Sequence, residues 1–139
     1  MLSALARRSK ALWGYDHAFM EACRDELTLE APDIDAGRVF VLESAGQPIG
    51  FYLVEPLHGA RMELGMLFVE PSVIRRGAGR VLLEHAKDAA RAAGAAWLVI
   101  QSDPHVVGFY EKLGATVVGA QPSASIEGRT LPLLELPLA

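Results

Sequence analysis

Residues 62–94 contain an apolar stretch, a short loop of arginines and glycines, and a long amphipathic segment, one after another. This order predicts a strand, a loop and a helix, and the loop becomes the helix at five residues: Arg75, Arg76, Gly77, Ala78 and Gly79. The first backbone N–H groups of a helix have no partner within it, and the helix dipole makes that end positive. Because two guanidinium groups lie beside these N–H groups, the sequence predicts a phosphate-binding site at the start of the helix.

The length and composition of the chain restrict its fold and its partners. Of 139 residues, 51% are hydrophobic and 22% are charged, so residues 1–139 are expected to form a single globular domain. The formal net charge of −4 gives no electrostatic reason to expect nucleic acid as a partner. Cys23 is the one cysteine, so neither a disulfide framework nor a cysteine-rich metal site is expected. No apolar run reaches the length of a membrane span, and we expect a cytoplasmic protein.

The N-terminal segment is basic, with Arg7, Arg8 and Lys10 and no acidic residue before Asp16. Mitochondrial presequences can have this composition, so a targeting segment is one interpretation. The other is an ordinary first helix with a basic outer face. Its inner face would then carry four residues: Leu2, Leu5, Ser9 and Leu12.

Turn residues divide the next part of the chain into a helix and three strands. Asp16 is a candidate N-cap for a helix over residues 17–29, and Pro32 would end that helix. Residues 44–48 contain glycine and proline between two β-rich runs, which predicts an antiparallel hairpin. The hairpin strands and the strand before the glycine loop are expected at residues 39–42, 49–54 and 62–69.

The helix after the glycines is expected to pack on a sheet, because its apolar residues recur on one side and its charged residues on the other. Gly94 would end it. Residues 96–100 are apolar without alternation, as in a strand that is covered on both faces. The order strand, helix, strand predicts a right-handed crossover between parallel strands. The apolar positions of the helix are Leu82, Ala86, Ala89 and Ala93.

A last helix is predicted to begin with Asp103 as its cap and Pro104 in its first turn, and to end at Gly114. A strand over residues 116–118 and a strand over residues 131–136 follow. A polar loop over residues 121–129 lies between them.

Two motifs in the chain resemble those of the GCN5-related N-acetyltransferase (GNAT) family. The first is LFVEP at residues 67–71 followed by RRGAGRVLL at residues 75–83, and the second is GFYEKLGA at residues 108–115. The order of the elements also agrees with the family from about residue 38 to the end of the chain.

The sequence departs from the family pattern in four places. Ile74 stands where the glycine motif usually has Gln or Arg, but backbone amides bind phosphate whatever the side chain. Asp103 replaces a common asparagine, and an aspartate can accept a hydrogen bond from the pantetheine arm but cannot donate one as an amide can. The chain begins with a helix rather than a strand, and Ala115 replaces an aromatic residue.

The resemblance implies an α/β (α+β) fold, in which helices on both faces flank a mixed, mostly antiparallel sheet with a central splayed pair of parallel strands. Acetyl-CoA would be the co-substrate in the V-shaped gap between residues 62–69 and 97–102, and no metal is required. The backbone amides of residues 75–80 would bind its pyrophosphate, and the pantetheine would run beside residues 67–69 like an added strand. The implied coenzyme-binding residues are Leu67, Phe68, Val69, Arg75, Arg76, Gly77, Ala78, Gly79, Arg80, Asp103 and Tyr110.

The amine that attacks acetyl-CoA must be neutral, whereas a lysine-like amine is neutral at pH 7 in only about one molecule in two thousand, a cost of about 4.6 kcal/mol. A general base is therefore useful. Glu63 on the strand before the glycines is the first candidate, acting through water, and a solvent-facing strand residue is the alternative interpretation. The other candidates for the base are His17, His58 and His105.

Tyr110 matches the family tyrosine that protonates the departing CoA thiolate. Proton transfer from a phenol to a thiolate is uphill by about 2 kcal/mol, so it must be concerted with bond cleavage or the tyrosine pKa must be lowered. A core residue of the last helix is the alternative interpretation.

The expected acceptor is a small-molecule amine, and a cationic one fits the acidic balance of the chain. The family binds its acceptor with the first two helices, their connection and the loop before the last strand. Trp13, Tyr15 and Arg129 are therefore candidates, although each can also be explained as a packing residue or a solvated charge. Homodimerisation is an expectation of the resemblance, while neither nucleic acid nor a membrane is expected as a partner. Cys23 is far in sequence from the motifs, so we expect direct transfer without an acyl-enzyme.

Other functions fit these residues less well. Gly77, Ala78 and Gly79 begin a dinucleotide-binding fingerprint, but Leu82 occupies the place of its third glycine. A nucleoside-triphosphate loop is excluded because no glycine–lysine–serine or glycine–lysine–threonine follows. A stronger alternative is a non-catalytic acyl-CoA-binding sensor of the same fold, which the departures at Ile74 and Asp103 motivate.

Overall fold

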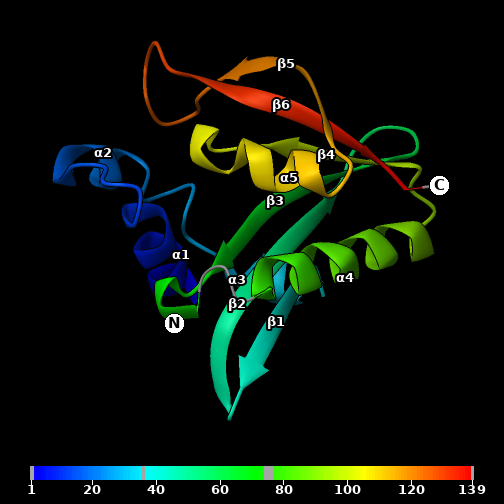
Figure 1. Cartoon of the computed structure of the whole chain (residues 1–139), viewed down its shortest axis with the longest axis horizontal. Coiled ribbons are helices and arrows are strands. Elements are labelled where there is room, and N and C mark those ends of the chain that lie inside the picture. The colour runs from blue at the N-terminus through cyan, green and yellow to red at the C-terminus, as the bar shows by residue number, and fades with distance from the viewer. Residues whose placement is uncertain (1, 36, 74–76, 139) are drawn as a thin grey trace. The chain divides into compact units, whose positions relative to one another are not determined.

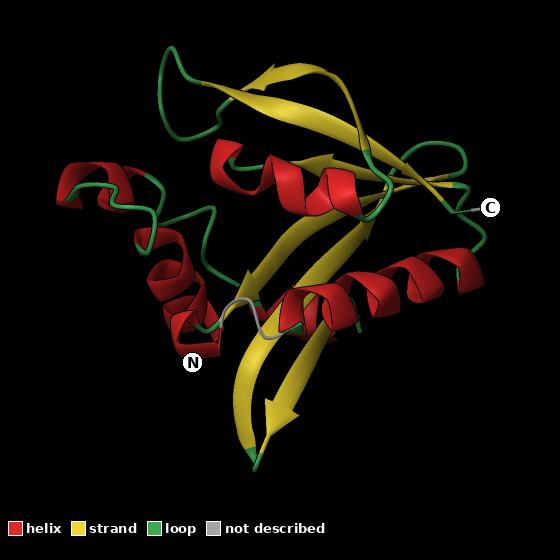
Figure 2. Cartoon of the chain, viewed as in Figure 1, coloured by secondary structure: helices red, strands yellow, loops and turns green. Residues whose placement is uncertain are grey.

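The computed structural model describes residues 2–35, 37–73 and 77–138, whose helices and strands are drawn in Figures 1 and 2. Arg75 and Arg76 lie outside the described residues, as does Ile74. The helices are α1 (Leu2–Ala11), α2 (His17–Ala22), α3 (Ala31–Asp35), α4 (Ala78–Ala92) and α5 (Val107–Lys112), with 3-10 turns η1 (Pro71–Val73) and η2 (Pro104–Val106). The strands are β1 (Val39–Ser44), β2 (Gln47–Pro56), β3 (Arg61–Val69), β4 (Trp97–Gln101), β5 (Thr116–Pro122) and β6 (Thr130–Pro137).

Across the described residues the strands form one mixed sheet in the order β1-β2-β3-β4-β6-β5, flanked by helices. The pairs β1–β2, β4–β6 and β5–β6 are antiparallel, whereas β3 and β4 are parallel. The parallel pairing runs from Arg61 opposite Trp97 to Leu64 opposite Ile100. The prediction of a mixed, mostly antiparallel sheet with one central parallel pair is therefore confirmed.

The chain divides into two compact units. The first unit comprises Met1–Leu53 and Met66–Leu83, and the second unit comprises Val54–Gly65 and Glu84–Ala139. The single domain expected over residues 1–139 stays a prediction.

The predicted β-hairpin belongs to the first unit, where β1 and β2 pair antiparallel from Val39 opposite Leu53. Its turn residues, Ala45 and Gly46, have φ angles of 52° and 79°. Positive φ at both positions is the geometry of a tight two-residue hairpin turn, which matches the twist of the strands. The core of this unit contains the buried residues Leu5, Ala6, Cys23, Leu27, Phe51, Tyr52, Leu82 and Leu83.

The helix predicted over residues 17–29 is wrong in length. α2 ends at Ala22, and residues 23–27 form turns. Pro32 does not end this helix but lies in the first turn of α3. A first-turn proline loses no helical hydrogen bond, because the N–H at that position has no partner within the helix.

α1 buries Leu5 and Ser9, as expected for its inner face, and it also buries Ala6 and Lys10. Leu5 is in the core, whereas Leu12 is 46% exposed and Lys10, expected on a basic outer face, is 8% exposed. The Lys10 ammonium lies 3.9 Å from Glu26 Oε1 and 5.6 Å from the centre of the Tyr15 ring. An aliphatic stem allows a lysine to be buried in this way while its charge keeps a partner.

β4 is the central strand of the second unit, and Leu98, Val99 and Ile100 are buried, as predicted for a strand covered on both faces. α5 stops before Gly114, whose φ of 104° favours glycine. A Cβ at Gly114 would lie 3.4 Å from Leu136 Cδ1, so the end of α5 packs closely on β6.

Two element borders of the second unit differ from the sequence prediction. β5 continues to Pro122, so the loop between β5 and β6 begins at Ser123 rather than at Gln121. The expected helical position Ala93 lies beyond the end of α4 and is exposed. None of the described helices is both long and apolar enough to cross a membrane.

Candidate functional site

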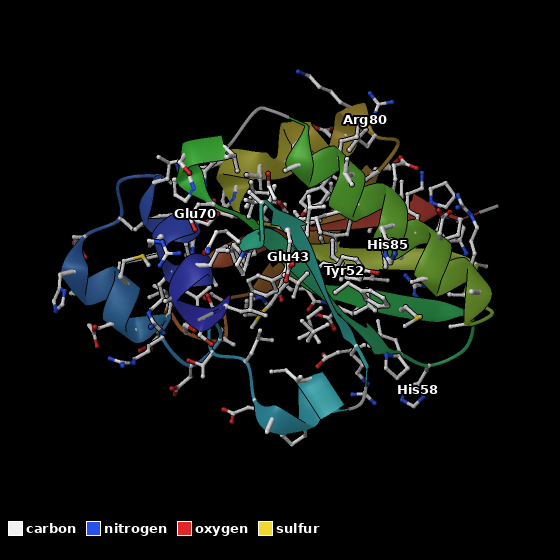
Figure 3. All side chains as sticks on the ribbon, turned by 90° about the horizontal axis from the view of Figure 1, so that it is seen from below. Glu43, Tyr52, His58, Glu70, Arg80 and His85 are labelled. Carbon is white, nitrogen blue, oxygen red and sulfur yellow. The ribbon has the colours of Figure 1, made fainter. Side chains whose placement is uncertain are left out.

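The start of α4 carries the part of the predicted phosphate site that the structure describes. Gly77 has a φ of 86°, which favours glycine, and its carbonyl accepts the first helical hydrogen bond, from Val81 N–H at 3.1 Å. The first N–H groups of a helix have no partner within the helix. Arg80 projects from this first turn (Figure 3) and is exposed. The contributions of Arg75 and Arg76 stay predictions.

The end of β3 carries the residues expected beside the pantetheine arm. Leu67 and Phe68 are half-buried and Val69 is buried. The Phe68 ring lies 6.0 Å from that of Phe51, between centres. The backbone here is the part that the resemblance assigns to coenzyme binding.

Gly50 on β2 was missed as a residue of this region. A Cβ at this position would lie 2.8 Å from Leu82 Cδ1 and 3.0 Å from the Phe68 carbonyl oxygen. The missing side chain therefore lets the first turns of α4 and the end of β3 lie close to β2. An isolated glycine inside a strand pattern was the signal that could have identified it.

Glu70, the residue that follows β3, was also missed. Its carboxylate accepts two hydrogen bonds from Arg8 of α1, from Nε at 2.9 Å and Nη2 at 2.7 Å. Figure 3 shows Glu70 beside α1. The Arg8 guanidinium lowers the pKa of Glu70, and the carboxylate raises the pKa of Arg8. No local sequence signal pairs residues so far apart in the chain.

Glu63, the predicted base, lies on β3 opposite Val99 of β4 and is half-buried. Burial raises the pKa of Glu63 above its ordinary value, and the negative charge of Glu55 raises it further. A carboxylate with a raised pKa is a stronger base than an ordinary one.

Tyr110, the predicted acid, lies on α5 and is only 5% exposed. Its ring makes an edge-on contact with Phe109, 5.1 Å between centres. Burial raises the pKa of Tyr110 well above the ordinary value of a phenol. A lowered pKa, one of the two expected ways to ease proton transfer to the thiolate, is therefore not what the structure provides.

The structure brings together two residues that the sequence assigned to different tasks, Asp103 for the coenzyme and Arg129 for the acceptor. Arg129 Nη2 lies 3.7 Å from Asp103 Oδ2, and both side chains are largely buried. Asp103 also accepts the His105 N–H at 2.9 Å and lies 2.8 Å from His105 Nδ1. Asp103 therefore is an N-cap, as predicted, but it caps the 3-10 turn η2 rather than α5, which begins at Val107. Asp103 also links η2 to the loop before β6.

The other acceptor candidates, Trp13 and Tyr15, are half-buried in the first unit. The Tyr15 ring stacks on Phe19, 4.0 Å between centres. Tyr15 therefore packs against Phe19, whether or not it also binds the acceptor. Among the alternative bases, His17 is at the exposed start of α2 and His58 lies in the exposed turn before β3 (Figure 3).

Within residues 2–35, 37–73 and 77–138, no group of three or more His, Cys, Asp or Glu residues is placed to hold a metal ion. Cys23 is fully buried.

The sequence profile of the acetyltransferase (GNAT) family matches residues 7–115 of this chain. The chain belongs to the GNAT family. The predicted resemblance is therefore confirmed.

Two named relatives share part of the chain. Peptidyl-lysine N-acetyltransferase YjaB of Escherichia coli (strain K12) is 37% identical over 90 residues, which are 65% of this chain and 56% of that protein. The protein of the same name in Salmonella typhimurium is 34% identical over 90 residues, 65% of this chain and 57% of that one. The match thus spans little more than half the length of these relatives.

Solved structures share the GNAT fold. A GCN5-related N-acetyltransferase from Rhodopseudomonas palustris has a TM-score of 0.77 and 22% identity, over 98% of this chain and 87% of that one. The PaiA N-acetyltransferase of Thermoplasma acidophilum, in complex with coenzyme A, has a TM-score of 0.73 and 17% identity, over 98% and 90%. At these identities the likeness establishes the fold alone.

Proposed function

We propose that this chain is an N-acetyltransferase that transfers the acetyl group of acetyl-CoA directly to an amine. The observation that carries the proposal is the positive-φ glycine, Gly77, just before α4, in the stretch that resembles the glycine motif of the family. The start of a helix, whose first N–H groups have no partner within the helix, suits the pyrophosphate of acetyl-CoA. The coenzyme-binding residues are those expected from the sequence, with Leu67 to Val69 beside the pantetheine.

In the proposed reaction Glu63 accepts, through water, a proton from the acceptor ammonium. The neutral amine then attacks the acetyl carbonyl carbon, and a backbone N–H near Phe68 or Val69 hydrogen-bonds the oxygen that becomes negative. The tetrahedral intermediate collapses with cleavage of the carbon–sulfur bond. The amide and CoA leave as products, the second amine proton replaces the one that Tyr110 gives to the sulfur, and Glu63 releases its proton to solvent.

Tyr110 is the proposed donor to the CoA sulfur. Since burial raises its pKa, complete proton transfer before bond cleavage would cost more than for an ordinary phenol. The phenol therefore acts as a hydrogen-bond donor during cleavage, with proton transfer concerted with departure of the sulfur. Its raised pKa keeps the hydroxyl protonated throughout the physiological pH range.

The acceptor we propose to test first is a lysine side chain in a peptide. The support is the name of the relatives, peptidyl-lysine N-acetyltransferase, at 37% and 34% identity. A small-molecule amine, the acceptor expected from the sequence, carries the same ammonium chemistry and stays the second acceptor class. Trp13, Tyr15 and Arg129 are candidate acceptor-binding residues for both.

A non-catalytic acyl-CoA-binding sensor is the competing function. Its support is that Asp103, which was expected to bind the pantetheine arm, already interacts with His105 and Arg129. The sensor would bind acetyl-CoA without turning over any amine.

The deciding experiment is calorimetric titration of acetyl-CoA into the wild type and the Gly79→Glu variant, which adds bulk and negative charge at the start of α4. The proposal expects micromolar binding by the wild type and its loss in the variant. Absence of binding by the folded wild type would overturn it. Release of free thiol is then followed with lysine peptides and with small amines, and a binder that turns over none of them would be the sensor.

The proposal also includes a cytoplasmic location, a reaction without a metal ion, and a homodimer. Light scattering on the purified chain tests the homodimer, and turnover in the presence of a chelator tests the metal requirement.

A further inference from the structure

We infer that Arg8 is a positioning residue for the coenzyme, acting through Glu70. The inference rests on the proposed binding of acetyl-CoA at the start of α4. Arg8 holds and neutralises the carboxylate of the residue that leaves β3, so that this charge does not oppose the phosphates of the coenzyme.

The first step of the argument is that Glu70 is anchored on three sides within the first unit. Its N–H donates to the Ile49 carbonyl of β2 at 2.8 Å, and its carbonyl accepts the Val73 N–H of η1 at 3.0 Å. Its carboxylate makes the two hydrogen bonds with Arg8. Glu70 therefore fixes the backbone where β3 ends and the glycine loop begins.

The second step is that the same part of β2 also contacts α4. Gly50, the neighbour of Ile49, would bring a Cβ within 2.8 Å of Leu82 in the second turn of α4 and 3.6 Å of Val69 Cα. Ile49 and Gly50 thus connect Glu70 with the helix whose N-terminus is the proposed phosphate site.

The third step is electrostatic. Glu70 carries a negative charge at the end of β3, in the part of the chain that leads to the proposed phosphate site, where a negative charge would oppose phosphate binding. The fork of two hydrogen bonds to Arg8 compensates that charge and directs the carboxylate to α1. The lowered pKa of Glu70 agrees with a carboxylate that stays charged and paired.

The test compares CoA binding by the wild type, Arg8→Met, Glu70→Gln and the double variant. Removing Arg8 alone leaves the Glu70 charge uncompensated, and the dissociation constant of CoA should rise about three- to five-fold, the range of an exposed ion pair. Glu70→Gln alone should bind CoA as tightly as the wild type or more tightly. In the double variant the dissociation constant should return to within about two-fold of the wild type.

A substrate without phosphates separates this role from a general loss of structure. With S-acetylpantetheine as acetyl donor, the kcat/KM of Arg8→Met should equal that of the wild type, because no phosphate is present to feel the Glu70 charge. Arg8→Lys keeps the positive charge and should bind CoA within about two-fold of the wild type. Arg24→Met, which removes a surface ion pair with Glu21 at 3.7 Å, is the matched control and should bind CoA normally.

Equal CoA affinity of wild type and folded Arg8→Met would overturn the inference. A double variant as weak as Arg8→Met would also overturn it, since Arg8 would then act otherwise than through Glu70. Loss of activity with S-acetylpantetheine to the same extent as with acetyl-CoA would indicate a structural role only. If the wild type itself does not bind CoA, the proposed function fails instead. Should Arg8→Met not fold, a Glu70→Gln or Arg8→Lys variant with markedly weaker CoA binding overturns the inference.

Discussion

A Cβ atom on Gly50 would lie 2.8 Å from Leu82 Cδ1 and 3.0 Å from the carbonyl oxygen of Phe68. The leucine methyl group can rotate away, but the carbonyl belongs to the backbone of β3 and cannot move alone. In the first unit, β2, β3 and α4 therefore lie so close together at Gly50 that a side chain at this position would clash. Space here, rather than backbone conformation, requires glycine, because Gly50 has no positive φ.

Gly50→Ala should lower the free energy of unfolding by about 1–3 kcal/mol, the cost of overpacking a core. Urea unfolding followed by circular dichroism measures this change. Gly119→Ala is the matched control, because Gly119 also lies in a strand but a Cβ there meets no atom within 4 Å. The control should stay within about 0.5 kcal/mol of the wild type. Equal stability of Gly50→Ala and the wild type would mean that β3 can shift at no cost.

Glu63→Gln should lower kcat about 10²- to 10³-fold if the carboxylate is the base, since an amide cannot accept the proton. The raised pKa of Glu63 means that the wild-type kcat/KM increases with pH as this carboxylate loses its proton, at a pH above the usual range for glutamate. The variant should lack that increase. A pH–rate profile from about pH 5 to pH 9 measures both effects. An unchanged profile would assign the base to another residue, with His105 the first to test.

Glu55→Gln should move the increase of kcat/KM with pH, which we assign to Glu63, to lower pH. The negative charge of Glu55 is the second cause of the raised Glu63 pKa, so its removal lowers that pKa while the effect of burial remains. At a pH below the wild-type limb, the variant should consequently be the more active enzyme. The midpoint of kcat/KM against pH is the measurement, and Glu43→Gln on β1 serves as a charge-matched control. A limb that shifts upward would contradict the assignment of Glu63.

Tyr110→Phe should lower kcat about 10²-fold while leaving the dissociation constant of CoA within about two-fold, because only the hydroxyl is removed from a buried ring. Because the pKa of Tyr110 is raised, kcat should not fall at the alkaline pH at which an ordinary phenol loses its proton. Thiol release and calorimetry give the two numbers. Full activity of a folded variant would make Tyr110 a packing residue, the alternative interpretation of its sequence position.

The elements that sequence predicted well depend on local signals. Gly77, Gly94 and Gly114 all have positive φ and mark the start of α4 and the chain just beyond α4 and α5, and an apolar run without alternation identified β4. Helix α2 was predicted too long because the apolar spacing continues after Ala22 although the chain there forms turns. Local spacing does not determine where a helix loses its packing partner.

The ion pairs of the site could not be predicted, because pairing partners are chosen by the tertiary structure. Arg8 and Glu70 are 62 positions apart, and nothing in either segment refers to the other. The burial of Lys10 could not be predicted either, because its partners Glu26 and the Tyr15 ring come close to it only in the folded chain. Motifs predicted a coenzyme site, while the ion pair between Arg8 and Glu70 became visible only in the fold.

Substitutions of Asp103 distinguish whether its charge or its capping hydrogen bond contributes to stability and CoA binding. Asp103→Asn keeps an oxygen that can accept the His105 N–H and adds an amide that can donate to pantetheine, whereas Asp103→Ala removes the cap. The alanine variant should lose about 1 kcal/mol of stability and bind CoA more weakly, and the asparagine variant should stay within about 0.5 kcal/mol of the wild type and bind CoA at least as tightly. Both variants remove the charge opposite Arg129, so any effect that they share reports on that ion pair. Urea unfolding and calorimetry with CoA are the measurements. If asparagine is as harmful as alanine, the ion pair to Arg129 rather than the cap holds this part of the second unit together.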